Sequence, residues 1–557
     1  MIEFRERVRM KKTVGIYLLE QLYQKGVQHI FGIPGDYILR FDKVIEKYPT
    51  IQFINATREN TAGYMADAYA RIKGLGVACI TYGVGINIVN ALSQAYVENS
   101  PLVVISGAAG LAELEKEIRL HHLFNKSLHK HLETTQLDIF RNITIAQTVL
   151  NEPCLFASEI DRVLTACLVH KKPVYIEIPR DQVDAEMEGG RLAFMLDSAS
   201  DPFALQEAIE DVTQILQKSE RPVIWVGHEV LRYGLADAVL EFAQKFSIPI
   251  VSTLLGKAAI DEWDSHFLGV YLGGMSHSEV QNYVNSADCL LRLGVLLNDL
   301  DTGIFTAKFH QKNQIIVINH EVQVNHHYYS EVLLKDFVGL LKKIELQKTF
   351  DQNYPSNAKR APKAFVANHQ RLTVDRLFDC LQTHLTSEHL VISDIGDSLF
   401  GSAELILHQN AYMACAHFAS LSFAVPAAIG AQLANPRQRP IVLVGDGAFQ
   451  MSAMELSTAV RYGLDPIVIV LNNHGYGTER PIIEGSYNDV HDWNYVAIPQ
   501  VLEGGKGVRV TTEEELNQAL QTAVFARGTF YLIEVDLDKN DHSQVLKRFG
   551  ELMNQHA

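Results

Sequence analysis

The chain has 557 residues, 47% of them hydrophobic and 20% charged, a composition typical of a globular protein of about three or four domains. Its formal net charge of −16 argues against a nucleic-acid partner, because an acidic surface repels a phosphate backbone. No segment reaches the roughly 18 uninterrupted apolar residues of a membrane span, and the charged N-terminus lacks the apolar core of a signal peptide. We therefore expect a cytoplasmic location without membrane contacts. Translation could start at Met1 or at Met10.

The expected elements alternate between apolar runs of strand length and helical stretches, which predicts parallel sheets covered by helices. The strands expected in the first unit are His29–Ile33, Ile51–Asn55, Val77–Tyr82, Leu102–Ser106 and Pro173–Ile178. A helix is expected over Thr61–Arg71, and the polar segment Arg180–Pro202 is interpreted as a linker.

Two further units repeat this pattern. The strands expected in the second unit are Pro222–Val226, Pro249–Ser252, Cys289–Leu293 and Gln314–Ile318. A polar linker over Leu346–Ala364 precedes the third unit, in which we expect the strands His389–Asp394, Pro440–Gly445, Pro466–Leu471 and Gly528–Val535 and a last helix over Ser543–Asn554. The fold class is therefore α/β, with three doubly wound parallel-sheet domains over residues 11–185, 200–345 and 368–557.

The cysteines are scattered along the chain and form no CxxC pair. They are Cys79, Cys154, Cys167, Cys289, Cys380 and Cys415. Because a metal site or a disulfide framework requires clustered cysteines, we expect buried free thiols in a reducing compartment.

The segment from Arg439 to Asn473 carries the strongest chemical signal. One apolar strand ends at Gly445-Asp446-Gly447 and the next ends at Asn472-Asn473. The helix expected between them has Met454, Leu456, Ala459 and Val460 at its apolar positions and ends at Gly463. A right-handed crossover brings the carboxyl ends of both strands together. The carboxylate of Asp446 and the amide of Asn473 would then suit Mg²⁺, and the glycines would let backbone N–H groups approach a diphosphate.

This Gly-Asp-Gly, helix, Asn-Asn pattern resembles the cofactor motif of the thiamine-diphosphate enzymes. The resemblance implies that Asp446, Asn473 and the carbonyl of Gly475 bind the metal, which bridges to the diphosphate. It also implies cofactor contacts from Gly445, Gly447 and Ala448, the last at a position where many relatives carry a hydroxyl residue.

A second segment, Ala56–Arg71, places Glu59 between a strand and a Gly- and Ala-rich helix. Alone, this glutamate fits an exposed carboxylate in a first helical turn equally well. The whole segment, however, resembles the activating-glutamate segment of the same family. That resemblance implies that Glu59 hydrogen-bonds the pyrimidine ring of the cofactor and drives the tautomer that deprotonates thiazolium C2. It also places Leu421 under the bend of the cofactor. The carbonyl of Ala419, at a position where glycine is usual, would contact the amino group of the cofactor.

Three further motifs indicate which reaction is catalysed. They are Ile33–Tyr37 with Asp36, the pair His121-His122, and Glu479. Each alone fits a structural turn or a solvated loop, but together they resemble the pyruvate, indolepyruvate and branched-chain 2-oxo-acid decarboxylases, and this resemblance spans essentially the whole chain. It implies non-oxidative decarboxylation to an aldehyde and CO₂ through a thiamine-bound enamine. Glu479 would handle protonation, while Asp36 and His122, supported by His121, would relay the proton during product release.

The same resemblance places Gly396, Asp397 and Ser398 near the cofactor and Leu399 in the substrate pocket, together with Thr478, Ile482 and Phe549. Pyruvate decarboxylases carry Trp, Ile and Trp at the positions of Leu399, Thr478 and Phe549. The smaller side chains favour branched, longer aliphatic or aromatic 2-oxo acids over pyruvate, with about 0.8 kcal/mol for each buried methylene. The alternative is that backbone shifts refill the space.

Two other functions remain open at this point. A carboligase of the acetolactate synthase kind would share Glu59 and the metal segment but would lack the histidine pair and the Glu479 motif. A catalytically dead thiamine-binding regulatory protein would be expected to have lost Glu59, Glu479 or a metal ligand, and none of these is lost. The middle unit has no GxGxxG motif, so FAD or NAD is not expected there. The resemblance implies a homodimer or homotetramer with active sites between chains.

Overall fold

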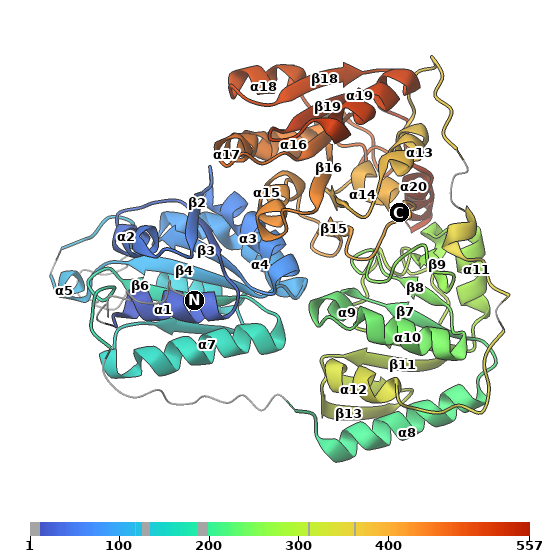
Figure 1. Cartoon of the computed structure of the whole chain (residues 1–557), viewed down its shortest axis with the longest axis horizontal. Helices are drawn as coiled ribbons and strands as arrows, with labels where there is room; N and C mark the ends of the chain where they lie inside the picture. Colours follow the sequence, from blue (N-terminus) through green and yellow to red (C-terminus); the bar gives the residue numbers. More distant parts are fainter. Residues whose placement is uncertain are drawn as a thin grey trace, which may run out of the picture. The chain divides into compact units, whose positions relative to one another are not determined.

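The computed structural model describes residues 12–116, 118–124, 134–187, 199–309, 312–351, 353–360 and 364–556. The chain divides into two compact units, residues 1–197 and 198–557 (Figure 1). Both candidate start methionines lie outside the described residues, as do residues 188–198 of the first predicted linker and residues 352 and 361–363 of the second. The three predicted domain ranges remain predictions.

The first unit contains one parallel sheet in the order β2-β1-β3-β4-β6-β5. Its strands are β1 (His29–Gly32), β2 (Gln52–Asn55), β3 (Gly76–Thr81), β4 (Leu102–Ala108), β5 (Ala146–Val149) and β6 (Val174–Pro179). Its helices are α1 (Val14–Gln24), α2 (Leu39–Lys47), α3 (Glu59–Lys73), α4 (Val89–Val97), α5 (Leu111–Leu114), α6 (Thr135–Arg141) and α7 (Phe156–His170), with 3₁₀ turns η1 (Val84–Ile88) and η2 (Pro153–Leu155). Strands β3, β4 and β6 are buried along their whole length, which explains why they read as continuous apolar runs.

The second unit contains two sheets, and the first of them has the order β13-β12-β11-β10-β7-β8-β9. Its strands are β7 (Pro222–Val226), β8 (Ile250–Ser252), β9 (Phe267–Val270), β10 (Cys289–Leu293), β11 (Asn313–Ile318), β12 (His320–Val324) and β13 (His327–Val332). The surrounding helices are α8 (Pro202–Lys218), α9 (His228–Arg232), α10 (Ala236–Phe246), α11 (Ser278–Ser286) and α12 (Leu334–Leu341), with turns η3 (Gly273–Met275) and η4 (Asn357–Arg360). Strands β12 and β13 add to the parallel strands as an antiparallel edge, which sequence reasoning did not predict.

The other sheet of this unit has the order β15-β14-β16-β17-β19-β18 and is parallel. Its strands are β14 (His389–Ser393), β15 (Tyr412–Ala414), β16 (Arg439–Gly445), β17 (Ile467–Asn472), β18 (Lys506–Val510) and β19 (Tyr531–Asp536). Its helices are α13 (Val374–His384), α14 (Asp397–Ser402), α15 (Ala424–Ala434), α16 (Asp446–Ser452), α17 (Leu456–Arg461), α18 (Ile498–Val501), α19 (Glu513–Phe525) and α20 (Gln544–His556), with turns η5 (Ala453–Glu455), η6 (Ser486–Asn488) and η7 (Tyr495–Ala497). The chain leaves β14 toward β15 on one side and later returns to β16 on the other. This reversal opens a crevice at the carboxyl ends of β14 and β16, where sheets of this kind bind ligands.

The predicted α/β class with three mostly parallel sheets is confirmed, but two details of the prediction were wrong. The helix expected after Gly-Asp-Gly is broken into α16, η5 and α17, and the 3₁₀ turn rotates Met454 outward, so that it is 50% exposed. Leu456 and Ala459 are buried as expected. Cys154 is exposed in η2, whereas the other five cysteines are buried and free. No helix among the described residues is long and apolar enough to cross a membrane.

Candidate functional site

A cavity of about 340 Å³ lies in the second unit at the carboxyl ends of β14, β16 and β17. The residues that line it include almost all those predicted for the cofactor and the metal: Gly396, Asp397, Ser398, Ala419, Leu421, Gly445, Asp446, Gly447, Ala448, Asn473 and Gly475. Leu399, Thr478, Glu479 and Phe549 line the same cavity. Ile482 lies outside its lining. A helical turn, in which Ile482 N donates to Glu479 O at 3.0 Å, places Ile482 against the core. Its predicted contact with substrate remains untested.

Three oxygen-bearing groups converge in one corner of this cavity. The outer end of the Asn473 amide lies 2.9 Å from the carbonyl oxygen of Gly475 and 3.3 Å from Asp446 Oδ1. With its nitrogen outward, this amide would donate to both groups, and with its oxygen outward, three oxygens would face one another with no donor between them. The second arrangement is what a hard cation stabilises, because Mg²⁺ binds carboxylate, amide and carbonyl oxygens. The corner therefore fits a magnesium ion.

Two buried polar atoms of the cavity support this fit. Asp446 Oδ2 and Ser398 Oγ are buried and have no hydrogen-bond partner among the described residues. Burial raises the pKa of Asp446 to about 6, with hydrogen bonds from the backbone of Gly447 and Gly475 opposing the shift. A bound cation would supply Asp446 with the missing partner and favour its charged form, since an opposite charge nearby lowers a carboxyl pKa.

Asp394, directly after β14, fixes the loop that was predicted to support the bent cofactor. Its Oδ1 accepts hydrogen bonds from the backbone N–H of Ile395 at 3.0 Å and Ser422 at 3.1 Å, and its Oδ2 accepts one from Ala424 at 3.0 Å. Ala419 in this loop adopts φ 59°, the left-handed region that favours glycine. The predicted contact to the cofactor is the backbone carbonyl, which alanine also provides. The cost of alanine at this position is backbone strain from the positive φ. Sequence reasoning missed Asp394, which is buried and carries no motif.

Helix α20 is tied to the cavity by the two residues that precede it. Asp397 Oδ1 accepts a hydrogen bond from the N–H of Ser543 at 3.0 Å, and Asp397 Oδ2 lies 3.3 Å from His542 Nδ1. Further along, Phe549 stacks on Phe400 of α14, with ring centroids 5.3 Å apart. The last helix thereby forms part of the pocket wall.

Glu479 is exposed on a loop that a buried arginine holds in place. Arg480 Nη2 donates to His474 O at 3.1 Å and to Asp489 Oδ1 at 2.8 Å, and its Nη1 donates to Glu484 Oε1 at 2.7 Å. Charge-assisted hydrogen bonds from one guanidinium to three positions of the loop hold it more firmly than a single ion pair would. Sequence reasoning missed Arg480, although its place directly after Glu479 was a usable signal.

In the first unit, Glu59 is the first residue of α3, as expected from its place between a strand and a helix. Its Oε2 accepts a hydrogen bond from Asn87 Nδ2 at 3.0 Å. Asn87 comes from η1, so the two residues, 28 positions apart, are held together by the packing of α3 on η1. Glu59 is half-buried.

The same unit brings Asp36, His121 and His122 together. Asp36 Oδ2 is 3.0 Å from His121 Nε2, and Asp36 Oδ1 is 3.9 Å from His122 Nε2. Tyr37 donates from its hydroxyl to the carbonyl of His121 at 2.8 Å and stacks on the ring of that histidine. Arg180 Nη1 lies 3.7 Å from Asp36 Oδ2. The three residues predicted as a proton relay are thus within reach of one another.

The comparisons with known proteins cover both units. Residues 12–137, 209–339 and 394–535 match the N-terminal TPP binding domain, the central domain and the C-terminal TPP binding domain of the thiamine pyrophosphate enzymes. The chain is 36% identical over 541 residues to indole-3-pyruvate decarboxylase of Azospirillum brasilense, covering 96% of each protein. It is 32% identical to pyruvate decarboxylase 2 of Arabidopsis thaliana, covering 97% of this chain and 90% of that protein. It is 30% identical to pyruvate decarboxylase isozyme 3 of Saccharomyces cerevisiae, covering 97% and 98%.

The chain belongs to the thiamine-diphosphate-dependent 2-oxo-acid decarboxylases. It is therefore a carboxy-lyase that uses thiamine diphosphate and acts on a small-molecule 2-oxo acid. Membership in this family confirms the prediction of class and cofactor made from the sequence.

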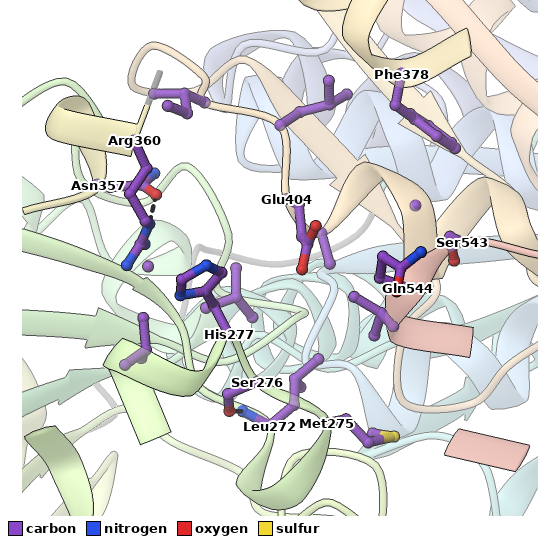
Figure 2. Close-up of a pocket in the computed structure, with 18 of the residues that line it drawn as sticks. Leu272, Met275, Ser276, His277, Asn357, Arg360, Phe378, Glu404, Ser543 and Gln544 are labelled. Carbon is purple, nitrogen blue, oxygen red and sulfur yellow. Dashed lines mark hydrogen bonds between the residues drawn. The ribbon is translucent and has the colours of Figure 1, made fainter. Parts of the chain in front are cut away.

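This decarboxylase has a second cavity in the same unit, of about 360 Å³, for which the sequence carried no motif. Figure 2 shows Arg360, Asn357 and His277 across this cavity from Ser543 and Gln544, with Glu404 between them. The first residues of helix α14 line the cofactor cavity. Gly401, near its end, and residues that follow the helix line the second cavity. Glu404 accepts from Arg548 at 2.8 Å, and Arg360 donates to Asn357 at 2.8 Å, so these charged groups already have partners. Helix α14 is the wall between the two cavities.

Proposed function

We propose that this decarboxylase favours branched, longer aliphatic or aromatic 2-oxo acids over pyruvate. The observation that carries the proposal is that Leu399, Thr478 and Phe549 line one cavity with Glu479 and the oxygen corner at Asp446. Each of the three is smaller than the residue that the resemblance assigns to pyruvate decarboxylases. The relative named as an indole-3-pyruvate decarboxylase is consistent with a bulky substrate. Added acyl carbons would be stabilised by burial there, at about 0.8 kcal/mol each.

The residues of the second unit would hold the cofactor. Asp446, Asn473 and the carbonyl of Gly475 would bind Mg²⁺, and the backbone of Gly445, Gly447 and Ala448 would approach the diphosphate. When bound, thiamine diphosphate would supply a nucleophilic carbon for the 2-oxo group and an electron-poor ring that takes up the electron pair released with CO₂. Leu421 would support the bend of the cofactor, and the Ala419 carbonyl would accept a hydrogen bond from its amino group.

The acid–base groups divide between the two units. Glu479 would donate the proton that replaces CO₂ on the reacting carbon. Asp36 and His122, supported by His121, would take up the hydroxyl proton as the aldehyde leaves. Glu59 would accept a hydrogen bond from the protonated pyrimidine ring. Glu59 belongs to one unit and Asp446 to the other, and the resemblance implies active sites between chains, so we propose a homodimer or homotetramer in which each site is completed by two chains.

The deciding experiment is the formation of aldehyde from a panel of 2-oxo acids, with and without thiamine diphosphate and Mg²⁺. The panel should contain pyruvate, 2-oxoisovalerate, 4-methyl-2-oxopentanoate, phenylpyruvate and indole-3-pyruvate. We expect kcat/KM to be higher for several of the bulky acids than for pyruvate. A preference for pyruvate over all of them would refute the proposed specificity, and acetolactate as the main product from pyruvate would favour the carboligase alternative.

A further inference from the structure

Among the residues that the structure describes, one group of histidine and carboxylate side chains is arranged to share a single ion: Asp36, His121 and His122. One ligand atom from each lies within 4.8 Å of the other two. The two carboxylate-to-imidazole distances are 3.0 and 3.9 Å. They bracket the separation of about 3.3 Å between ligands placed tetrahedrally around an ion at bond lengths of about 2.0–2.1 Å.

The backbone holds the two neighbouring histidines in this arrangement. His122 adopts φ 66°, which turns its side chain toward the same side as that of His121, and the two rings lie with centroids 4.5 Å apart. Gly83 gives the room this requires, since a Cβ there would lie 2.2 Å from the His122 carbonyl oxygen. Tyr37 stacks on His121 at 5.3 Å and holds its carbonyl by a hydrogen bond. The ligands are therefore largely preorganised, which lowers the entropy lost on binding.

The local charge permits a cation despite the presence of an arginine. Arg180 lies near Asp36, but its Nε also donates to Glu113 Oε2 at 2.9 Å, and a second contact joins the same two side chains. With both imidazoles neutral, two carboxylates face one guanidinium, so the cluster has a net charge of −1. Arg180 can stay with Glu113 when an ion replaces its weaker contact with Asp36.

We propose that Asp36, His121 and His122 form a binding site for a borderline divalent transition-metal ion, with Zn²⁺ as the probe. Two imidazoles and a carboxylate suit Zn²⁺, whereas Mg²⁺ prefers a set of oxygen ligands. Water would complete the tetrahedron, as in zinc sites with three protein ligands. This site differs in ligands and in position from the oxygen corner at Asp446. An ion bound here occupies the nitrogens that the proposed proton relay uses, so it would inhibit turnover.

Binding is measured on the intact protein with thiamine diphosphate and Mg²⁺ at saturation. Calorimetry with Zn²⁺ should show one strong site per chain, and Co²⁺ at the same site should show the intense visible absorption of a four-coordinate ion. His121→Gln should weaken binding at least tenfold and remove that absorption. His122→Asn, which tolerates a positive φ, should do the same. Binding that is absent in the parent, or unchanged in both variants, would overturn the proposal.

The matched control is His327→Gln. His327 Nδ1 lies 3.1 Å from Asp211 Oδ2 in an exposed pair, and the described residues offer no third ligand there. This variant should bind Zn²⁺ as the parent does. Loss of the strong site in His327→Gln as well would mean that the ion binds elsewhere, which overturns the assignment.

Inhibition is tested separately, because it rests on the proposed role of the histidines whereas binding does not. Decarboxylation should fall as Zn²⁺ fills the site and recover when a zinc-selective chelator is added in the presence of excess Mg²⁺. Full activity with the site occupied would refute the proton relay and leave the metal site standing. Inhibition without binding at His121 would refute the metal site and leave the proposed function intact.

Discussion

Enlarging Leu399 to tryptophan should narrow the proposed acyl pocket. Leu399 is fully buried in the first turn of α14, lines the cofactor cavity and precedes Phe400, which stacks on Phe549. Because this position is buried, an indole ring here cannot point into solvent. It must therefore occupy part of the 340 Å³ cavity. We expect Leu399→Trp to shift the preference toward pyruvate and away from larger 2-oxo acids.

The size of this shift follows from the buried carbons. The side chain of 4-methyl-2-oxopentanoate has three more carbons than that of pyruvate, so losing their burial costs about 2.4 kcal/mol, or roughly 60-fold. Overpacking a well-packed wall costs roughly 1–3 kcal/mol, which gives a range of about 5- to 150-fold in kcat/KM. A methyl group should be spared, because it reaches less far toward the wall.

The assay compares kcat/KM for the two substrates in parent and variant, so that changes in the amount of active enzyme cancel. Leu405→Trp is the matched control, because Leu405 is buried in the same core but lines the neighbouring cavity. That control should lower stability without changing the ratio. An unchanged ratio in Leu399→Trp, or an equal change in Leu405→Trp, would remove the main support for a pocket wider than that of pyruvate decarboxylases.

The other predictions concern the cofactor, the metal, pH and assembly. Glu59→Gln should still bind thiamine diphosphate but should slow C2 proton exchange by orders of magnitude in NMR after acid quench, and near-normal exchange would contradict its role. Asp446→Ala should lose metal-dependent retention of the cofactor in calorimetry, and retention equal to that of the parent would place the metal elsewhere. Burial raises the pKa of Asp301 to about 7, so its contribution to stability is present in acid and is lost as the pH rises through that value. The free energy of unfolding of Asp301→Asn relative to that of the parent should therefore rise from pH 5 to pH 8, toward a limit of about 4 kcal/mol. Thermal unfolding at both pH values checks this, and a Tm difference that stays constant would refute the shift. The smallest active form should be a dimer in light scattering at assay concentration, and an active monomer would contradict this.

The two strands whose bounds sequence reasoning predicted without error, β7 and β10, are buried along their whole length. Strands β16 and β17 differ from the predicted bounds by one residue at one or both ends. Continuous apolar runs mark such strands clearly. Short edge strands such as β15, with three residues, and β18, which is largely exposed, lack that signal. The break of the helix at η5 was not predicted for a related reason. The spacing of apolar residues in a helix does not reveal a local change to 3₁₀ geometry.

The predicted site residues fall together because they follow parallel strands. Asp446 and Asn473 end neighbouring strands, so the order of the sheet alone brings them to one corner. The residues that hold other segments of the cavity wall could not be predicted in that way. His542 contacts Asp397, which lies 145 positions away in the sequence. Asp394 accepts hydrogen bonds from the N–H groups of Ser422 and Ala424, which belong to a later loop. Neither contact leaves a periodicity or a spacing in the sequence.

Those missed residues share one physical role, which is to hold irregular backbone in place. The cavity is lined by segments with left-handed or otherwise unusual conformations: Ala419 at φ 59°, Gly396 at φ 99° and Gly475 at φ 149°. Such backbone is costly unless the surrounding structure fixes it. Asp394 fixes the Ala419 loop through the N–H groups of Ser422 and Ala424, and Arg480 fixes the loop of Gly475 and Glu479 through a carbonyl and two carboxylates. The motif residues thus bring the chemistry, and buried charges without a motif keep them in the geometry that the chemistry requires.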